Sequence, residues 1–404
     1  MKKYLNNYIA TFFLAIGLLK PTGISDLATY VGGYWNLLSK ALSGLMVIEA
    51  LLIMLMALYF IKRSKRQFPF LICLFLFESW YMVADIINGI SVGRDWKYVA
   101  ASISLVLLVF VYDQNETLMI LLKTILIILL ICILINFFSI VVFPGGLYVD
   151  ERNWWQNYFL GYKNRHIYFF LPYICIQAVV DISEKKRLSA QFYVMSIIIF
   201  ISSILINSST CVFSILLTLV GIVIFRNSRV SKFLTLGKEF IFSSILTVIF
   251  FLVTNMKFFG DLIYALFKKN ATFTGRTNIW EASLRLIAQK PIFGCGAVSL
   301  ENVDTSVWNV TFTQAHNKYL DILLSGGIIM LMIFAVLCWL VNRKLKKNKI
   351  VFSQIFVWTL GGYAILFLME SSKSDVFFFL IMYLAYIVES IEKERQNRLI
   401  KEGN

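Results

Sequence analysis

Long apolar stretches recur along nearly the whole chain, and they limit what this sequence can fold into. A transmembrane helix needs about 20 mostly apolar residues to cross the hydrocarbon core of a bilayer. Only helices and closed barrels satisfy the backbone inside lipid, and unbroken runs of this length exclude barrel strands. We therefore predict an all-α polytopic integral membrane protein. The roughly twelve predicted spans are 5–20, 43–61, 67–88, 98–112, 117–143, 166–181, 189–206, 210–225, 238–256, 318–341, 351–369 and 375–391.

The net charge of +15 on 404 residues reflects membrane topology rather than a nucleic-acid partner. Basic clusters fall in alternate short loops, as the positive-inside rule requires of cytoplasmic loops. This pattern places both termini in the cytoplasm and leaves 144–165 and 257–317 outside. We expect a single polytopic membrane domain over 1–404, with 257–317 as its large extracytoplasmic loop. The clusters are Lys2-Lys3, Lys62 to Arg66, Lys185 to Arg187, Arg226 to Lys238, Arg343 to Lys349 and the tail from Lys393 to Lys401.

The stretch 189–225 has two interpretations. It is either a hairpin broken at Asn207-Ser208-Ser209 or a re-entrant pair. Both interpretations put the polar tripeptide at the turn.

The polar segment 257–317 is the longest interruption of the apolar series, and it is the best pointer to function. Its Thr277 to Gln289 stretch predicts a helix lying along the membrane surface, with Trp280 on its apolar face. Arg276 falls at the first turn, beside free backbone N–H groups and the positive end of the helix dipole, where phosphate is attracted. The alternative is an interfacial helix in which arginine and tryptophan only anchor at the lipid headgroups.

Two short features follow this helix. Gly294-Cys295-Gly296, after Pro291, predicts a turn that returns the chain toward the membrane. His316-Asn317 then precedes the span that begins near Lys318. A histidine at a membrane mouth can act as a general base near neutral pH, and its alternative role is a polar residue at a helix start.

The outer loop before the sixth predicted span is also rich in polar and aromatic residues. Lys163, Arg165 and His166 stand directly before that span. Aromatic side chains in such a loop either stack on sugar rings or anchor at the interface. The aromatic residues are Trp154, Trp155 and Tyr158.

Motifs for nucleotide or metal chemistry are missing from the sequence. It contains no GxGxxG, Walker loop, HExxH, D-x-D pair or CxxC arrangement. Their absence argues against nucleotide-driven transport and against a metal-dependent nucleotide-sugar transferase. We expect no cofactor and no metal.

The order of the motifs carries a resemblance. T-G-R-T-x-I-W, then P-x-x-G-x-G, then H-N-x-x-L running into an apolar helix with G-G-I is similar to the O-antigen ligase/Wzy-type polymerase superfamily, over Thr274 to Ile329. The resemblance implies a multi-pass protein of the bacterial cytoplasmic membrane. Such proteins transfer a glycan from undecaprenyl diphosphate to an acceptor hydroxyl on the outer face. Polymerases join repeat units into capsule, O-antigen or exopolysaccharide, and ligases pass a finished glycan to a lipid, protein or wall acceptor.

The resemblance also implies site residues. Arg276 matches the loop arginine, His316 the loop histidine, and Asn317 lies beside it. One departure is that Thr210 stands where the family commonly has the arginine of a Ser-Arg pair. The expected roles are Arg276 and Arg165 on the pyrophosphate, His316 as base or acceptor orienter, and Asn317 as its support. The other substrate-binding candidates are Lys163, Trp280, Arg285 and Lys290.

Three functions therefore compete. A polymerase is favoured, a ligase of the same superfamily is its rival, and a lipid-linked oligosaccharide flippase is the third. Transporters concentrate polar residues within spans near the midplane. Here the spans hold only scattered charges, at Glu49, Glu78, Asp85 and Lys123. The expected partners are the undecaprenyl-diphosphate-linked glycan, membrane lipid, a flippase and a chain-length regulator.

Overall fold

The computed structural model describes residues 2–61, 66–91, 96–150, 155–227, 233–253, 276–296, 314–348, 350–371 and 376–403. Each predicted span contains a helix within these residues. The helices are α1 Lys2–Phe13, α2 Thr22–Tyr30, α3 Tyr34–Ile61, α4 Phe68–Ile87, α5 Trp96–Gln114, α6 Leu118–Val142, α7 Ile167–Lys185, α8 Ala190–Leu205, α9 Ser209–Val220, α11 Leu236–Val253, α13 Arg276–Gln289, α14 Lys318–Lys347, α15 Val351–Met369, α16 Val376–Tyr386 and α17 Val388–Gly403, with a 3-10 turn η2 at Lys163–Arg165 and a π-helical turn η3 at Gly221–Phe225.

Among the described residues, seven helices are long and apolar enough to cross a membrane. They are α3, α4, α5, α6, the Lys163–Lys185 unit, α14 and α15, and α8, Ser209–Phe225 and α16 are shorter apolar helices. The fold is consistent with a helical, multi-pass membrane protein. The larger number of spans and their sidedness stay predictions.

The predicted break within 189–225 and the predicted first span differ in outcome. The predicted break at Asn207-Ser208-Ser209 is present, because α8 ends at Leu205, α9 begins at Ser209, and Asn207 between them has a left-handed φ of 53°. The hairpin and the re-entrant pair both stay predictions. The first span, by contrast, is interrupted, since α1 ends at Phe13. Beyond that end, the buried Glu49 carboxylate accepts the backbone N–H groups of Gly17 and Leu18, both at 2.9 Å. A buried carboxylate needs such donors, so the chain bends around it.

The loop before α7 forms a small sheet that the sequence did not predict. Strands β1 Tyr148–Asp150, β2 Trp155–Tyr158 and β3 Gly161–Tyr162 pair antiparallel in the order β1-β2-β3. Within the described residues, the fold is therefore helical except for this sheet, which directly precedes η2.

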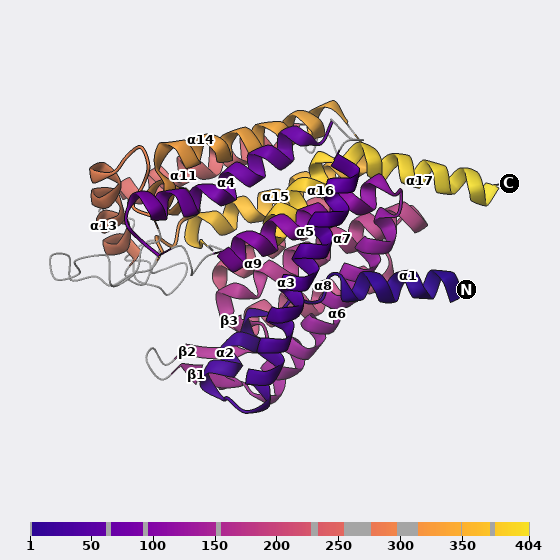
Figure 1. The fold of residues 1–404 in the computed structure, drawn as a ribbon, viewed down its shortest axis with the longest axis horizontal. Helices are drawn as coiled ribbons and strands as arrows, with labels where there is room; N and C mark the ends of the chain where they lie inside the picture. Colours follow the sequence, from indigo (N-terminus) through magenta and orange to yellow (C-terminus); the bar gives the residue numbers. More distant parts are fainter. Residues whose placement is uncertain are drawn as a thin grey trace.

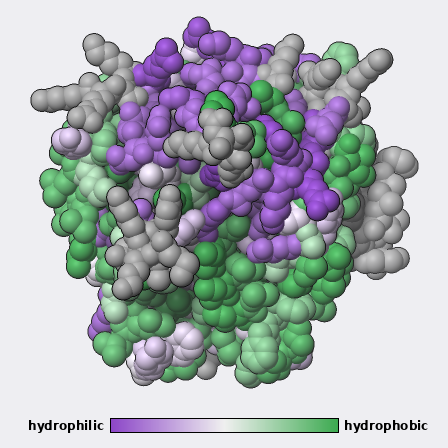
Figure 2. Space-filling model, turned by 90° about the vertical axis from the view of Figure 1, so that its right-hand side faces the viewer, coloured by the Kyte–Doolittle hydropathy of each residue, from purple (hydrophilic) through white to green (hydrophobic). Residues whose placement is uncertain are grey.

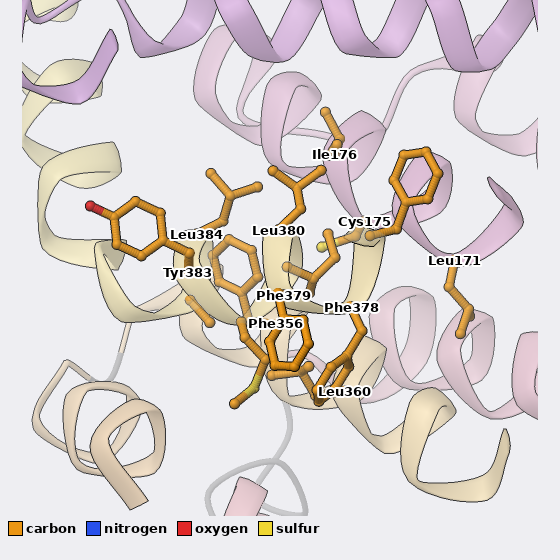
Figure 3. Packing of buried hydrophobic residues seen from close by; sticks show 14 of the residues in the cluster. Leu171, Cys175, Ile176, Phe356, Leu360, Phe378, Phe379, Leu380, Tyr383 and Leu384 are labelled. Carbon is orange, nitrogen blue, oxygen red and sulfur yellow. The ribbon is translucent and has the colours of Figure 1, made fainter. Parts of the chain in front are cut away.

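The centre of the molecule is the short helix α16, all of whose residues are buried. Figure 3 shows its phenylalanines between α7 and α15. The Phe378 ring lies 4.9 Å from that of Phe367 and 5.2 Å from that of Tyr363, both in α15. Buried aromatic rings packed in this way contribute strongly to the stability of a core.

The two termini lie at one end of the molecule, and α13 lies at the opposite end (Figure 1). Figure 2 looks onto the end with the termini, where hydrophilic residues gather over the upper half and apolar residues cover the flanks. The basic last turn of α14, with Lys344, Lys346 and Lys347, belongs to this end. Its assignment to the cytoplasm stays a prediction.

The glycine motifs that follow α13 dock against a kink in α14. Gly327 breaks the helix with a φ of 65°. The Cys295 N–H donates to Leu324 O at 2.7 Å, and the Ile328 N–H donates to Pro291 O at 2.8 Å. The predicted turn at 294–296 is present, and it pairs backbone to backbone with α14. This pairing fixes where α13 stands relative to α14.

Candidate active site

The carboxylate of Glu370, just beyond the end of α15, is the centre of the candidate site. It is only 4% exposed. Its Oε1 accepts hydrogen bonds from Arg276 Nη2 at 2.5 Å and from Asn164 Nδ2 at 2.6 Å. Its Oε2 lies 3.5 Å from His316 Nδ1. One buried anion thus gathers three polar side chains from three distant parts of the chain.

Arg276 is the first residue of α13, one residue before the predicted start at Thr277, and so lies in the first turn as expected. Its guanidinium is held at two points on the end of α15, since Nη1 donates to Met369 O at 2.5 Å while Nη2 pairs with Glu370. The Arg276 side chain is 16% exposed. An arginine so placed presents a cation at a helix N-terminus, which is where an anionic ligand is favoured.

His316 is held in an unusual backbone conformation. Its φ is 49°, in the left-handed region that non-glycine residues seldom adopt. The side chain is 27% exposed, and its Nδ1 has no hydrogen-bond partner among the described residues. A strained backbone that presents a partly exposed imidazole indicates a functional position.

Asn317 is fully buried and fixes the residues on both sides of it. Its Oδ1 caps α14 by accepting the N–H groups of Tyr319 and Leu320, both at 3.1 Å. Its Nδ2 donates to Leu368 O at 3.1 Å and to Thr247 Oγ1 at 3.2 Å. Asn317 therefore joins the start of α14 to the end of α15, directly after His316.

The loop before His316 is clamped from two sides. The Trp280 indole N–H donates to Ala315 O at 2.9 Å, and the Ala315 N–H donates to Asp321 Oδ1 at 3.0 Å. Trp280 is only 2% exposed and packs with Leu320 and Leu324 of α14. The predicted apolar face of α13 is correct, but Trp280 packs inside the protein and offers no surface on which a sugar could stack.

The three residues of η2 take different directions. Asn164 reaches Glu370, whereas Arg165 Nη1 pairs with Asp26 of α2 at 2.8 Å. Lys163 Nζ lies 3.5 Å from Asn207 O. Lys163 and Arg165 were both predicted to bind substrate. Of the two, Lys163 contacts the 207–210 segment, where the arginine common in the family is missing.

Tyr162 lies within electrostatic reach of the same ion pair. Burial raises the pKa of its phenol, the Glu370 carboxylate raises it further, and Arg276 opposes both effects. The phenol therefore stays neutral and able to donate a hydrogen bond beside the site.

The other two basic candidates lie away from this centre. Arg285 is nine residues along α13 from Arg276, about 13 Å at the rise of an α-helix. It forms the predicted pair with Glu281 and is exposed. Lys290 lies beyond the end of α13, about 20 Å along the axis, and its Nζ bonds to Asn88 Oδ1 beside the α4 end. The structure brings neither cation to Glu370.

The second histidine is structural. His166 is fully buried, and its Nε2 donates to Gly161 O at 3.0 Å. Asn136 Nδ2 lies 3.3 Å from its Nδ1, while Asn136 Oδ1 accepts the Leu160 N–H. Among the predicted aromatic residues, Tyr158 is buried and T-stacked on His166, and Trp154 lies outside the described residues.

Sequence reasoning missed Glu370 and Asn164. Glu370 is the first acid after a long apolar helix and carries no motif, and Asn164 stands between two more conspicuous basic residues. Only their convergence on Arg276 marks them. Within the described ranges, no group of three or more His, Cys, Asp or Glu residues is arranged to hold a metal ion.

The comparisons with known proteins agree with the motif order. Residues 194–335 match the family model described as O-Antigen ligase. This match runs from α8 into α14, and it includes Arg276, His316 and Asn317 but not Asn164 or Glu370. No curated protein and no solved structure matches the chain. The match over residues 194–335 supports the similarity of this chain to the O-antigen ligase/Wzy-type superfamily.

Proposed function

We propose that this protein polymerises undecaprenyl-diphosphate-linked repeat units into a surface polysaccharide on the outer face of the bacterial cytoplasmic membrane. The observation that carries the proposal is the meeting of Arg276 and His316 on one carboxylate. Members of the superfamily act on lipid-linked glycans, and both residues fall in the matched region. The site combines a cation for a phosphate with an imidazole for a hydroxyl.

The chemistry requires one bond to form and one to break. The acceptor hydroxyl oxygen attacks the anomeric carbon, and the carbon–oxygen bond to the diphosphate breaks with its electron pair on the diphosphate. His316 Nε2 takes the hydroxyl proton as general base. Arg276 neutralises the leaving diphosphate. Direct displacement inverts the anomeric configuration and needs no nucleotide.

A second cation on the diphosphate would be Lys163. It contacts Asn207 O, in the segment where the family's second arginine is replaced by Thr210. Arg165 already has a carboxylate partner in Asp26, so we place it after Lys163 for this role.

The proposal is tested by substitution followed by sizing of the surface glycan. We expect His316→Ala to lower transfer by about 10²- to 10⁴-fold, the usual worth of a general base. Arg276→Ala would leave the buried Glu370 carboxylate without its cation, so a loss of folding could not be told from a loss of activity. Arg276→Lys is therefore preferable, because it keeps the charge but loses the two-point grip on phosphate. Arg285→Lys, on the same helix, is the matched control.

Normal polymer from His316→Ala or Arg276→Lys, at normal protein level, would refute the assignment. The rival function is a ligase, favoured by the description of the matched family. Deletion of the gene separates the two. A single repeat unit left on its acceptor indicates a polymerase, whereas full-length polymer retained on undecaprenyl carrier indicates a ligase.

A further inference from the structure

Glu370 forms an ion pair with Arg276, the cation that the substrate's diphosphate would need. Its Oε1 accepts from Arg276 and Asn164, while its Oε2 faces His316 across 3.5 Å. We propose that Glu370 is a resident anion that holds Arg276 while the site is empty and transfers to His316 when a diphosphate binds Arg276. Glu370 is then a positioning residue that couples donor binding to activation of the base. The inference rests on the proposed function of Arg276 and His316.

The first half of the exchange is a competition for Arg276. A diphosphate carries more negative charge than one carboxylate and offers several oxygens to a guanidinium. Arg276 Nη1 is bonded to Met369 O, not to the carboxylate. Loss of the Glu370 bond therefore releases Nη2 alone, and the guanidinium stays tethered to the end of α15. The side chain is also 16% exposed, so a ligand can approach it.

The second half concerns the displaced carboxylate. A buried anion left without a cation is costly, and Glu370 is only 4% exposed. The His316 Nδ1 is the next donor position, and it has no hydrogen-bond partner within the part of the chain described. Closing the 3.5 Å separation to a charge-assisted hydrogen bond needs a shift of under about 1 Å. Asn164, bonded to Oε1 and to Ser208, can hold the carboxylate during this shift.

Proton accounting supports the coupling. Before the glycan is transferred, the Nδ1–H of His316 donates a hydrogen bond to Glu370. The unprotonated Nε2 is then free to accept the proton of the acceptor hydroxyl. After transfer both ring nitrogens carry protons, and the carboxylate stabilises the imidazolium that results. The base is thus strengthened only when Arg276 is occupied by the donor. Such coupling would suppress proton abstraction from an acceptor in the absence of donor.

The test uses the full-length protein in nanodiscs, with inorganic pyrophosphate as the binding probe and the lipid-linked repeat unit as substrate. Glu370→Gln keeps the shape of the side chain and removes its charge. We expect pyrophosphate to bind about tenfold more tightly, because its competitor is gone. We also expect kcat to fall about 10²-fold, because His316 loses its partner, and KM to fall, because the donor binds Arg276 more tightly. A merely structural role would weaken binding and raise KM.

Two further variants complete the test. Glu281→Gln, which removes an exposed carboxylate from α13, should change neither constant. If Glu370→Gln does not fold, Asn164→Ala is the second variant: it removes a donor to Glu370 but keeps the carboxylate charged, so Glu370 should hold Arg276 more tightly and pyrophosphate should bind more weakly. Unchanged or weaker pyrophosphate binding in folded Glu370→Gln, or unchanged or tighter binding in folded Asn164→Ala, would overturn the inference. If the inference fails in this way but wild-type protein transfers glycan normally, the proposed function still stands. If the variants bind pyrophosphate as expected but wild-type protein transfers no glycan, the proposed function alone is refuted.

Discussion

The side-chain amide of Asn317 donates to Leu368 O at 3.1 Å, and this bond ties the start of α14 to the end of α15. His316 and Glu370 lie on the two sides of it, one residue before Asn317 and two residues after Leu368. The distance between the imidazole and the carboxylate therefore depends on a hydrogen bond that neither of them makes. An Asn317 variant should disturb the site through position, with its charges intact.

We predict that Asn317→Ala lowers both stability and transfer. Loss of the helix cap costs about 1 kcal/mol. Leu368 O, now without its donor, adds about 1–3 kcal/mol. Thermal unfolding in detergent and glycan sizing measure the two effects. Asn348→Ala, at the other end of α14, removes bonds to Lys344 and Glu389 and should leave transfer normal. Full polymer from Asn317→Ala would show that the tie is dispensable.

A second prediction concerns the kink in α14. Gly327 has a left-handed φ of 65°, and a Cβ there would stand 2.2 Å from Ile292 O. Gly327→Ala should therefore separate α14 from the 291–296 turn and displace α13 with Arg276. We expect a lower unfolding temperature and little transfer. Gly145→Ala is the matched control, because a Cβ at that position meets nothing within 4 Å. Equal behaviour of the two variants would contradict this account of the kink.

The extent to which sequence alone could anticipate this molecule differs between fold and site. Apolar runs located most of the long helices because the period of hydrophobicity is a local property, and α13 begins at Arg276, one residue before its predicted start at Thr277. The β-sheet was missed because its strands are two to four residues long. Glu370 was missed because its meaning depends on contacts with residues 94 and 206 positions away. Long-range convergence leaves no local pattern.

A third prediction separates the packing of the Trp280 ring from its hydrogen bond to the backbone of Ala315. Trp280→Phe keeps an aromatic ring in the buried cluster but loses the hydrogen bond to Ala315 O. Stability should fall by about 1 kcal/mol, the net worth of one hydrogen bond. Transfer should fall by a larger factor, because the loop that carries His316 loses one of its two clamps. Parallel measurement of unfolding temperature and kcat decides the point. A loss of transfer no greater than the loss of folded protein would assign Trp280 to packing alone.

The last prediction contrasts the two histidines. His166→Ala removes the partner of Gly161 O and leaves Asn136 Nδ2 without its acceptor, both in the buried interior. We expect a loss of about 1–3 kcal/mol for each unsatisfied group, seen as a lower unfolding temperature and less protein in the membrane. The molecules that do fold should transfer glycan at a near-normal rate, because the His166 side chain makes no hydrogen bond to Glu370 or to the described side chains gathered around it. His316→Ala should give the opposite result, with normal protein level and almost no transfer. Purified protein in nanodiscs allows kcat to be expressed per folded molecule, which removes the difference in abundance. If folded His166→Ala were as inactive as His316→Ala, the base could not be assigned to His316 by its loss of activity alone.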